Sequence, residues 1–470
     1  MAGGSTAGAL KFTVRRRPAV LVPPAAPTPR ELKRLSDIDD QETLRVHLPF
    51  ILFFRHNAAA SMAAAGRDPA SVIRDSLARA LVHYHPLAGR MRELGGRKLA
   101  VDCTGEGVLF IEADADVSLE HFRDPLLPPF MELIFDVPGS SAIVNSPLLL
   151  IQVTRLPCGD FVLGVRLMHH GMFDGPGFLQ FMGAMAELAR GASEPTVPPV
   201  WRRELLQARD PPRPRFAHRE YDDDLGEARA RGATPPLDLG DTLHRSFVFW
   251  PRDIAALRGH LPPRLRSSAT AFDILIGCLW KHRTAALAPD AGEEMRMICA
   301  VNARGGSLGG AGIPRGYYGN AFAFAVAVST AGKLCASPLG YAVELVKKAK
   351  GEVDMEYMRS VADLMVLRGR PSIAPANAYV VSDVTQAGRT NLDFGWGRPA
   401  YAAPTMSGVF IHSTGFSFLL PFTNGNREEG IAVPVCLPRD AMARFEQEMG
   451  KLLQHPPIDV AAQRQPRAAL

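Results

Sequence analysis

The sequence predicts an α/β fold with mixed sheets, divided into two domains. The chain has 470 residues, more than a single compact hydrophobic core usually serves. Runs typical of strands and of amphipathic helices alternate irregularly, and some strand pairs lie close enough in sequence to form hairpins. A long polar crossing near the middle interrupts this pattern, and we interpret it as a linker over residues 196–240 between domains 1–195 and 241–470.

Composition narrows the class of protein. Hydrophobic residues make up 47% of the chain and charged residues 21%, as is usual for a soluble globular protein. The net charge of +5 is too mild and diffuse to indicate nucleic-acid binding. The chain lacks an apolar signal-peptide core and a run of about eighteen apolar residues, so we expect no secretory leader and no membrane span. Six scattered cysteines without a CxxC pair predict reduced thiols and a cytoplasmic protein.

The expected elements of the first domain follow from local patterns. Asp68 and Pro69 open a helix, with the aspartate as its N-cap and the proline in its first turn. Residues 148–156 and 161–168 are typical of two strands joined by a short turn at Pro157. Apolar residues then recur at helical spacing, and a glycine suited to a C-cap follows them; these residues are Phe178, Met182, Met185, Leu188 and Gly191.

The second domain begins with an expected strand at 247–250. Thr270 is expected to cap the next helix, and Asp273 completes a pattern that resembles a capping box. The apolar stripes of all these helices indicate core packing. Near the C-terminus, we expect a segment after about residue 394 to pack back on the first domain.

The stretch LMHHGMFDGPG, residues 167–177, follows the second expected strand. Successive side chains of a strand point to opposite faces, so His169 and His170 cannot both face one cavity if the extended backbone continues. A histidine at a strand end suits general-base chemistry because its ordinary pKa lies near neutrality. Asp174 could fix the ring or the loop, while Gly175 and the second glycine let the chain turn into the next helix.

Two other interpretations of this stretch remain open from the residues alone. One is a polar turn that contains a buried, hydrogen-bonded histidine. The other is a pair of metal ligands, although adjacent histidines have poor geometry for one ion and no third ligand cluster follows. We therefore expect no metal site.

A second motif, DFGWG, comprises residues 393–397. Together with the HxxxDG pattern of His170, Asp174 and Gly175, it makes the chain resemble the BAHD family of plant acyl-CoA-dependent acyltransferases. The resemblance extends along nearly the whole chain and is greatest to the branch with benzyl alcohol benzoyltransferases and, near it, monolignol and taxane acyltransferases. The other segments that carry it are LSDID (35–39), HPLAGR (85–90), DCTGEGVLFIEADADVSLE (102–120), DVPGSS (136–141), PLLLIQVTRL (147–156), PPVW (198–201), HREYD (218–222), GYYGNAF (316–322) and VPVCLP (433–438).

The resemblance implies two chloramphenicol-acetyltransferase-like domains with a channel between them. Acyl-CoA would enter at one mouth and a small alcohol at the other, as substrates, and no cofactor would be needed. His170 would be the general base in direct attack on the thioester. Asp174 would point away from the channel and pair with an arginine, expected at Arg304. The resemblance also implies plant secondary metabolism, specifically phenylpropanoid or monolignol esters, and a monomer that binds neither nucleic acid nor membrane.

The remaining expected site residues are structural or substrate-binding. The resemblance makes DFGWG structural, through Asp393, Gly395, Trp396 and Gly397. Ser382 takes the place of a threonine found near the oxyanion in hydroxycinnamoyl-transferring relatives and is a candidate oxyanion donor. A tryptophan two residues later in those relatives is Val384 here. Arg266, Ser267 and Ser268 are candidate CoA contacts before a helix N-terminus; the alternative interpretation, which the residues alone favour slightly, is a solvated turn.

The expected reaction is transfer of a benzoyl or hydroxycinnamoyl group, such as p-coumaroyl or feruloyl, to benzyl alcohol or a monolignol. One alternative is acetyl-CoA-dependent acylation of a terpenoid or taxane-like alcohol. Another is a peptide-forming condensation domain, whose HHxxxDG signature is satisfied by the residues from His169 to Gly175. A third is a non-catalytic binding protein on the same fold, in which a broken histidine or aspartate would be expected.

Overall fold

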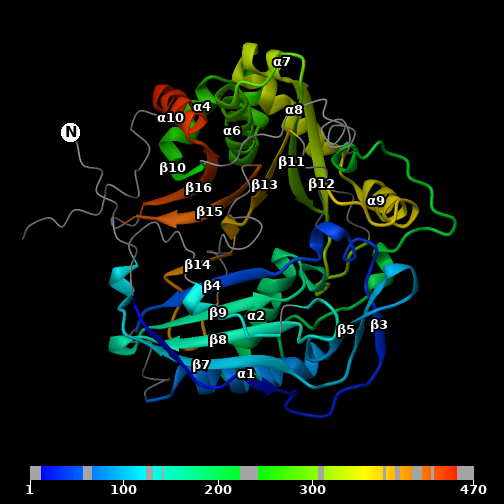
Figure 1. Ribbon diagram of the computed structural model, residues 1–470, viewed down its shortest axis with the longest axis vertical. Coiled ribbons are helices and arrows are strands. Elements are labelled where there is room, and N and C mark those ends of the chain that lie inside the picture. The colour runs from blue at the N-terminus through cyan, green and yellow to red at the C-terminus, as the bar shows by residue number, and fades with distance from the viewer. Residues whose placement is uncertain are drawn as a thin grey trace, which may run out of the picture.

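The computed structural model describes residues 12–56, 66–122, 131–139, 142–222, 242–304, 312–373, 377–386, 392–404, 415–424 and 428–452. Within these ranges the chain forms two halves, stacked along the long axis of the molecule, each built on one large sheet (Figure 1). Both sheets mix parallel and antiparallel pairs, as the α/β prediction with mixed sheets required.

The first sheet has the strand order β1-β7-β8-β9-β4-β14, and β2 also pairs with β7. Its parallel pair is β7 with β8. Helices α1 (Pro69–His83) and α2 (Gly175–Ala189) pack on one face of this sheet and enclose its main core. The strands are β1 (Val14–Arg16), β2 (Val20–Val22), β4 (Leu48–Phe54), β7 (Val108–Ala115), β8 (Leu149–Arg155), β9 (Phe161–Leu167) and β14 (Tyr401–Pro404).

A small antiparallel sheet accompanies the first half. Its order is β3-β6-β5, with bounds Leu32–Arg34, Leu99–Asp102 and Arg90–Glu93. The turn between β3 and β4 carries several buried acidic side chains, which contact more than one part of the chain, as described below.

The second sheet has the order β10-β16-β15-β13-β11-β12. Its strands are β10 (Thr242–Phe249), β11 (Glu294–Asn302), β12 (Phe322–Thr330), β13 (Ala378–Asp383), β15 (Phe416–Thr423) and β16 (Glu429–Pro438). The helices of this half lie mainly above the sheet (Figure 1). They are α4 (Pro251–Gly259), α5 (Pro263–Ser268), α6 (Ala271–Leu287), α7 (Ala331–Ala336), α8 (Leu339–Glu352), α9 (Met355–Leu367) and α10 (Arg439–Leu452).

The two faces of β12 separate the helical core from the boundary between the halves. Ala323 and Ala325 pack into the core that α6 and α8 share with the sheet. Phe322 and Phe324 lie on the opposite face and pack with Leu44 of the first half. Since strand side chains alternate between faces, this aromatic face of the second sheet is turned toward the first half.

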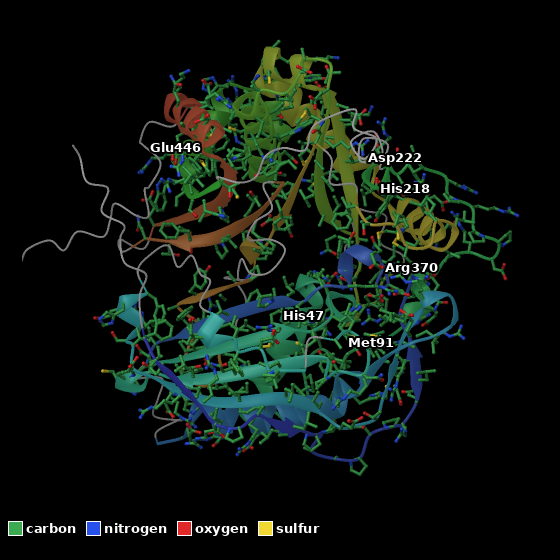
Figure 2. The ribbon with its side chains drawn as sticks, viewed as in Figure 1. His47, Met91, His218, Asp222, Arg370 and Glu446 are labelled. Carbon is green, nitrogen blue, oxygen red and sulfur yellow. The ribbon has the colours of Figure 1, made fainter. Side chains whose placement is uncertain are left out.

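Charged contacts also join the two halves. Arg370, between α9 and β13, lies where the halves meet (Figure 2), and its Nε donates to Asp40 Oδ2 at 2.9 Å. The segment that crosses from α2 to β10 is described as far as residue 222; the rest of the expected linker lies outside the described residues. It contains two short 3₁₀ turns, η9 (Arg203–Leu206) and η10 (Arg219–Tyr221).

The local predictions can be compared with these elements. Helix α1 begins at Pro69 and Asp68 accepts from Ser71 N at 3.0 Å, so the predicted cap is confirmed. The two predicted strands around Pro157 are β8 and β9. The strand expected at 247–250 was wrong at both ends: β10 starts at Thr242, where it pairs with β16, and Trp250 is already the N-cap of α4.

The C-terminal part of the chain divides between the two halves. Strand β14 pairs antiparallel with β4 and completes the first sheet, whereas β15, β16 and α10 return to the second half. Within the described residues, no helix is both long and apolar enough to cross a membrane.

Candidate active site

The histidine motif lies in a sharp connection between β9 and α2. Strand β9 ends at Leu167, and His169 is the N-cap of a one-turn 3₁₀ helix, η8 (His170–Met172). Asp174 is in turn the N-cap of α2, where its Oδ1 accepts from Gly177 N at 2.9 Å. The backbone therefore leaves the extended conformation at His170, and the two histidines are separated by a turn rather than by strand alternation.

His169 is fully buried and bonded within its own turn. Its Nδ1 accepts from Gly171 N at 2.9 Å, and burial lowers the pKa of its imidazole to about 3. A Cβ at position 171 would lie 2.5 Å from the His169 ring and 2.7 Å from the Asp39 carbonyl oxygen, so the glycine is needed for this close approach. His169 thus stays neutral and stabilises the turn.

His170 lies at the boundary between the halves and is only partly buried. Its ring centroid is 6.3 Å from that of Phe322, on the aromatic face of the second sheet. Burial lowers the pKa of the imidazole, while Asp174, among other groups, acts in the opposite direction. His170 is therefore neutral at neutral pH and able to accept a proton.

Asp174 connects three parts of the chain. Besides capping α2, its carboxylate oxygen Oδ2 lies 2.5 Å from Arg304 Nη1 and accepts from Ala321 N at 2.9 Å. The resemblance to the BAHD family implied this pairing with Arg304. Arg304 also donates to the carbonyls of Tyr317 and Gly319, so both partners are held by several hydrogen bonds.

Sequence reasoning missed three polar residues that hold the same loop. Asp39 and Arg203 form an ion pair of 2.7 Å and are almost completely buried. Asn320 donates through its side chain to Asp39 Oδ1 at 2.9 Å and to the His170 carbonyl at 3.0 Å. The signal was present in the quoted segments LSDID and GYYGNAF, but Arg203 lies in the expected linker, where polar residues look like solvated surface.

Ser382 lies on β13 and faces the same boundary. Strand alternation places it on the same side as Ala378 and Val380, which pack with Phe322 and Phe324. Its neighbour across the strand pair is Phe418. Ser382 thus shares the face of β13 that is turned toward the first half.

The DFGWG motif is attached to the first half at a distance from the histidine. Asp393 Oδ1 accepts from Gly395 N at 2.7 Å and from Gly397 N at 2.8 Å, and both glycines have positive φ. The Trp396 ring packs edge-on against Phe161 at 5.3 Å. The Asp393 carbonyl accepts from Arg190, which follows the C-terminal end of α2.

Helix α2 sets the separation between the two motifs, because the histidine loop lies at its N-terminal end. The helix has 15 residues, which corresponds to a length of about 22 Å. DFGWG is therefore a structural turn, closed by its own aspartate and anchored by aromatic side chains, well away from His170.

The candidate CoA residues lie on α5, directly before the N-terminus of α6. Arg266, Ser267 and Ser268 lie on the exposed surface of α5, and their side chains donate to nearby carbonyls, for example Arg266 Nη2 to Gly259 O at 3.0 Å. At the start of α6, the carboxylate of Asp273 already accepts from Thr270 N at 2.8 Å. The same carboxylate also pairs with Lys350 Nζ at 2.8 Å.

Neither a thiol nucleophile nor a metal cluster is found near the loop within the described ranges. Burial raises the pKa of Cys103, Cys278 and Cys299 to about 12, so these thiols stay protonated. No group of three or more histidine, cysteine or acidic side chains among the described residues could hold a metal ion.

Comparison with known proteins gives consistent matches over the full length. The model of the Transferase family matches residues 10–452. Benzyl alcohol O-benzoyltransferase of Petunia hybrida is 52% identical over 448 residues, which cover 95% of each chain. Alcohol acyl transferase 1 allele GSa of Malus domestica is 49% identical over 451 residues, again 95% of each. The crystal structure of vinorine synthase aligns with a TM-score of 0.66 at 22% identity, covering 94% of this chain and 98% of that one, and this likeness shows the fold.

Proposed function

The chain belongs to the Transferase family of BAHD acyltransferases, and from this premise we propose that it moves an aromatic acyl group from acyl-CoA to a small alcohol. Family membership makes it an acyl-CoA-dependent O-acyltransferase that needs no cofactor. The proposed donor is benzoyl-CoA or a hydroxycinnamoyl-CoA, and the proposed acceptor is benzyl alcohol or a monolignol. The observation that carries this choice is the 52% identity over 95% of the chain to a benzyl alcohol O-benzoyltransferase.

The surface beside His170 supports an aromatic substrate. Phe322 lies beside the imidazole, with ring centroids 6.3 Å apart, and it packs in one apolar cluster with Phe324, Ile298 and Val380. A planar acyl group or alcohol gains free energy by burying its ring against such a surface, and an acetyl group lacks that area. The proposed channel therefore runs between the halves, past His170.

The proposed mechanism is direct attack in a ternary complex. Neutral His170 takes the proton of the acceptor hydroxyl while its oxygen attacks the thioester carbonyl carbon. The tetrahedral intermediate then collapses, the carbon–sulfur bond breaks, and CoA leaves as the thiolate, which recovers the proton from the imidazolium. No acyl-enzyme is formed, in keeping with the protonated buried cysteines.

Two further residues have proposed roles in this reaction. Asp174 supports the base by holding its loop, since its oxygens are occupied by Arg304, Ala321 N and Gly177 N. Ser382 is proposed to donate a hydrogen bond to the developing oxyanion, because it lies on the boundary face of β13.

The test is a thiol-release assay with a panel of donors and acceptors. We expect kcat/KM to be highest for benzoyl- or p-coumaroyl-CoA with benzyl or coniferyl alcohol. Acetyl- and malonyl-CoA as donors, and shikimate and spermidine as acceptors, are the comparison set. A clear preference for any of these would contradict the proposed substrates and leave the family assignment intact.

A further inference from the structure

Three segments far apart in the sequence converge on the backbone of the histidine loop. Asp39 comes from the turn before β4, Arg203 from the crossing segment and Asn320 from the loop that leads into β12. Arg203 Nη2 donates to the Met172 carbonyl at 2.8 Å, and Asn320 Nδ2 donates to the His170 carbonyl at 3.0 Å. Two of the carbonyls of the turn that carries His170 are therefore held by side chains from outside that turn.

Asp39 connects these two donors. Its Oδ1 accepts from Arg203 Nη1 at 2.7 Å and from both the backbone N and Nδ2 of Asn320 at 2.9 Å. Its Oδ2 accepts from the backbone N and hydroxyl of Ser36 at 3.0 and 2.6 Å. Asp39 is fully buried, and a buried carboxylate with this many partners fixes their relative positions closely.

Arg203 is restrained on all sides. Its guanidinium lies 4.4 Å from the Trp201 ring centroid and 5.2 Å from that of Tyr318. A Cβ at position 319 would lie within 1.8 Å of Arg203 Nη1, so only glycine there allows the arginine to pass. These contacts hold the Arg203 guanidinium in one position, unlike that of an arginine on the surface.

The amide of Asn320 is oriented by its partners. Both hydrogens of its Nδ2 are used, by Asp39 and by the His170 carbonyl, which fixes the side where its Oδ1 lies. Asn320 Oδ1 and His170 Nδ1 are both buried and both lack a hydrogen-bond partner. Asn320 is also among the groups that counteract the effect of burial on the pKa of His170.

We propose that Asp39, Arg203 and Asn320 form one positioning unit, which holds the turn of His170 and thereby the orientation of its ring. The unit rests on the proposed role of His170 as the base. Asp39 and Arg203 act only through the backbone of the turn and through Asn320, and they do not touch the substrates. Because one member comes from the crossing segment, the unit couples the connection between the two halves to the base.

The chain offers a matched control in the same crossing segment. Asp363, also fully buried, accepts from Arg209 Nε and N at 2.7 Å and from Arg213 N at 2.8 Å, which clamps the segment to α9; these partners belong to the crossing segment and not to the histidine turn. Asp363→Asn therefore breaks a buried carboxylate–arginine pair that tethers the same segment but does not support the base.

The experiment compares Asp39→Asn, Arg203→Lys and Asp363→Asn in the full chain. It measures kcat, both KM values, the pH dependence of kcat/KM and Tm, with any donor and acceptor that the wild type uses. We expect Asp39→Asn to lower kcat by about 10- to 100-fold, as for the loss of a positioning contact, with KM values changed by less than about threefold. The acidic limb of the pH profile of kcat/KM should move to lower pH in this variant, because the Asp39 charge favours protonated His170.

Arg203→Lys keeps the positive charge but cannot serve both Asp39 and the Met172 carbonyl in the same geometry. This variant should lower kcat without shifting the acidic limb of the pH profile of kcat/KM. Because it is the milder change, it tests the unit even if Asp39→Asn does not fold. Asp363→Asn should lower Tm and leave kcat at 20 °C within about twofold. Equal kcat effects for the Asp39 and Asp363 variants would overturn the positioning unit, whereas an active His170→Ala would overturn the proposed function instead.

Discussion

The two signature motifs are held in place by different physical means. The turn from His169 to Asp174 is surrounded by buried charges and amides that come from the first half, the crossing segment and the second half. DFGWG closes on itself through Asp393 and two glycines with positive φ, and it is anchored by the packing of Phe394 and Trp396 in the first-half core. One motif depends on the whole fold, and the other on its own sequence and one apolar surface.

This difference separates a reactive turn from a structural one. A side chain that transfers protons must stay accessible to substrate. Its orientation therefore has to be fixed by polar contacts to its backbone rather than by burial of the side chain. A structural turn can bury its large side chains completely, as Phe394 and Trp396 do. We therefore expect a change of the reactive side chain His170 to alter catalysis more than stability, and changes in the second motif to do the opposite.

The largest effect is expected for His170→Ala. Loss of the general base should lower kcat by about 10³-fold or more, since such groups contribute about 10²–10⁴-fold, with Tm close to that of the wild type. The measurement is CoA release with benzoyl-CoA and benzyl alcohol. The matched control is His169→Asn, whose amide oxygen can replace Nδ1 as the acceptor for Gly171 N; an equal loss in this variant would contradict the choice of His170.

Breaking the pair of Asp174 and Arg304 should lower both kcat and the free energy of unfolding. Asp174→Asn keeps the cap of α2 but turns an amide NH₂ toward Arg304 or Ala321 N, so a buried ion pair is broken. Such losses typically destabilise by about 3–5 kcal/mol, and kcat should fall in parallel. Urea unfolding and kcat for both single variants and the double variant would measure the coupling; purely additive effects would contradict the pair.

Trp396→Ala tests the contrast between DFGWG and the histidine motif. Loss of the buried indole beside Phe161 should destabilise the chain by about 3–5 kcal/mol. At 20 °C, kcat should remain within a few-fold of the wild type, because α2 separates this turn from His170. Trp396→Phe keeps most of the apolar volume and should recover stability. A fall in kcat as large as that of His170→Ala, with Tm unchanged, would remove the distinction between the motifs.

The smallest effect is a loss of stability in acid. The pKa of His169 is lowered to about 3 in the folded chain, so the unfolded chain binds more protons as the pH falls below about 6.5. From pH 7 to pH 5, this group alone should reduce the free energy of unfolding by about 2 kcal/mol. His169→Asn cannot take up this proton, and unfolding curves at both pH values should show a correspondingly smaller difference. An unchanged difference would indicate that His169 is not the source.

Local signals in the sequence predicted the regular elements well. The caps at Asp68 and Thr270, the two strands around Pro157, and the helix that follows Asp174 all depend on contacts between residues a few positions apart. Capping and strand alternation have the same physics wherever they occur, so the residues alone indicate them. The resemblance based on the two motifs also predicted the family, and full-length relatives confirm it.

The tertiary structure alone decided how the site is held. Asp39 is 164 positions from Arg203 and 281 from Asn320, and no local pattern relates them. A charged residue in a polar stretch looks exposed, but burial is tolerated when a partner from elsewhere compensates the lost hydration, and only the fold supplies that partner. The same holds for the roles of His169 and His170: the sequence places them side by side, whereas the turn that buries one and leaves the other at the boundary between the halves exists only in the folded chain.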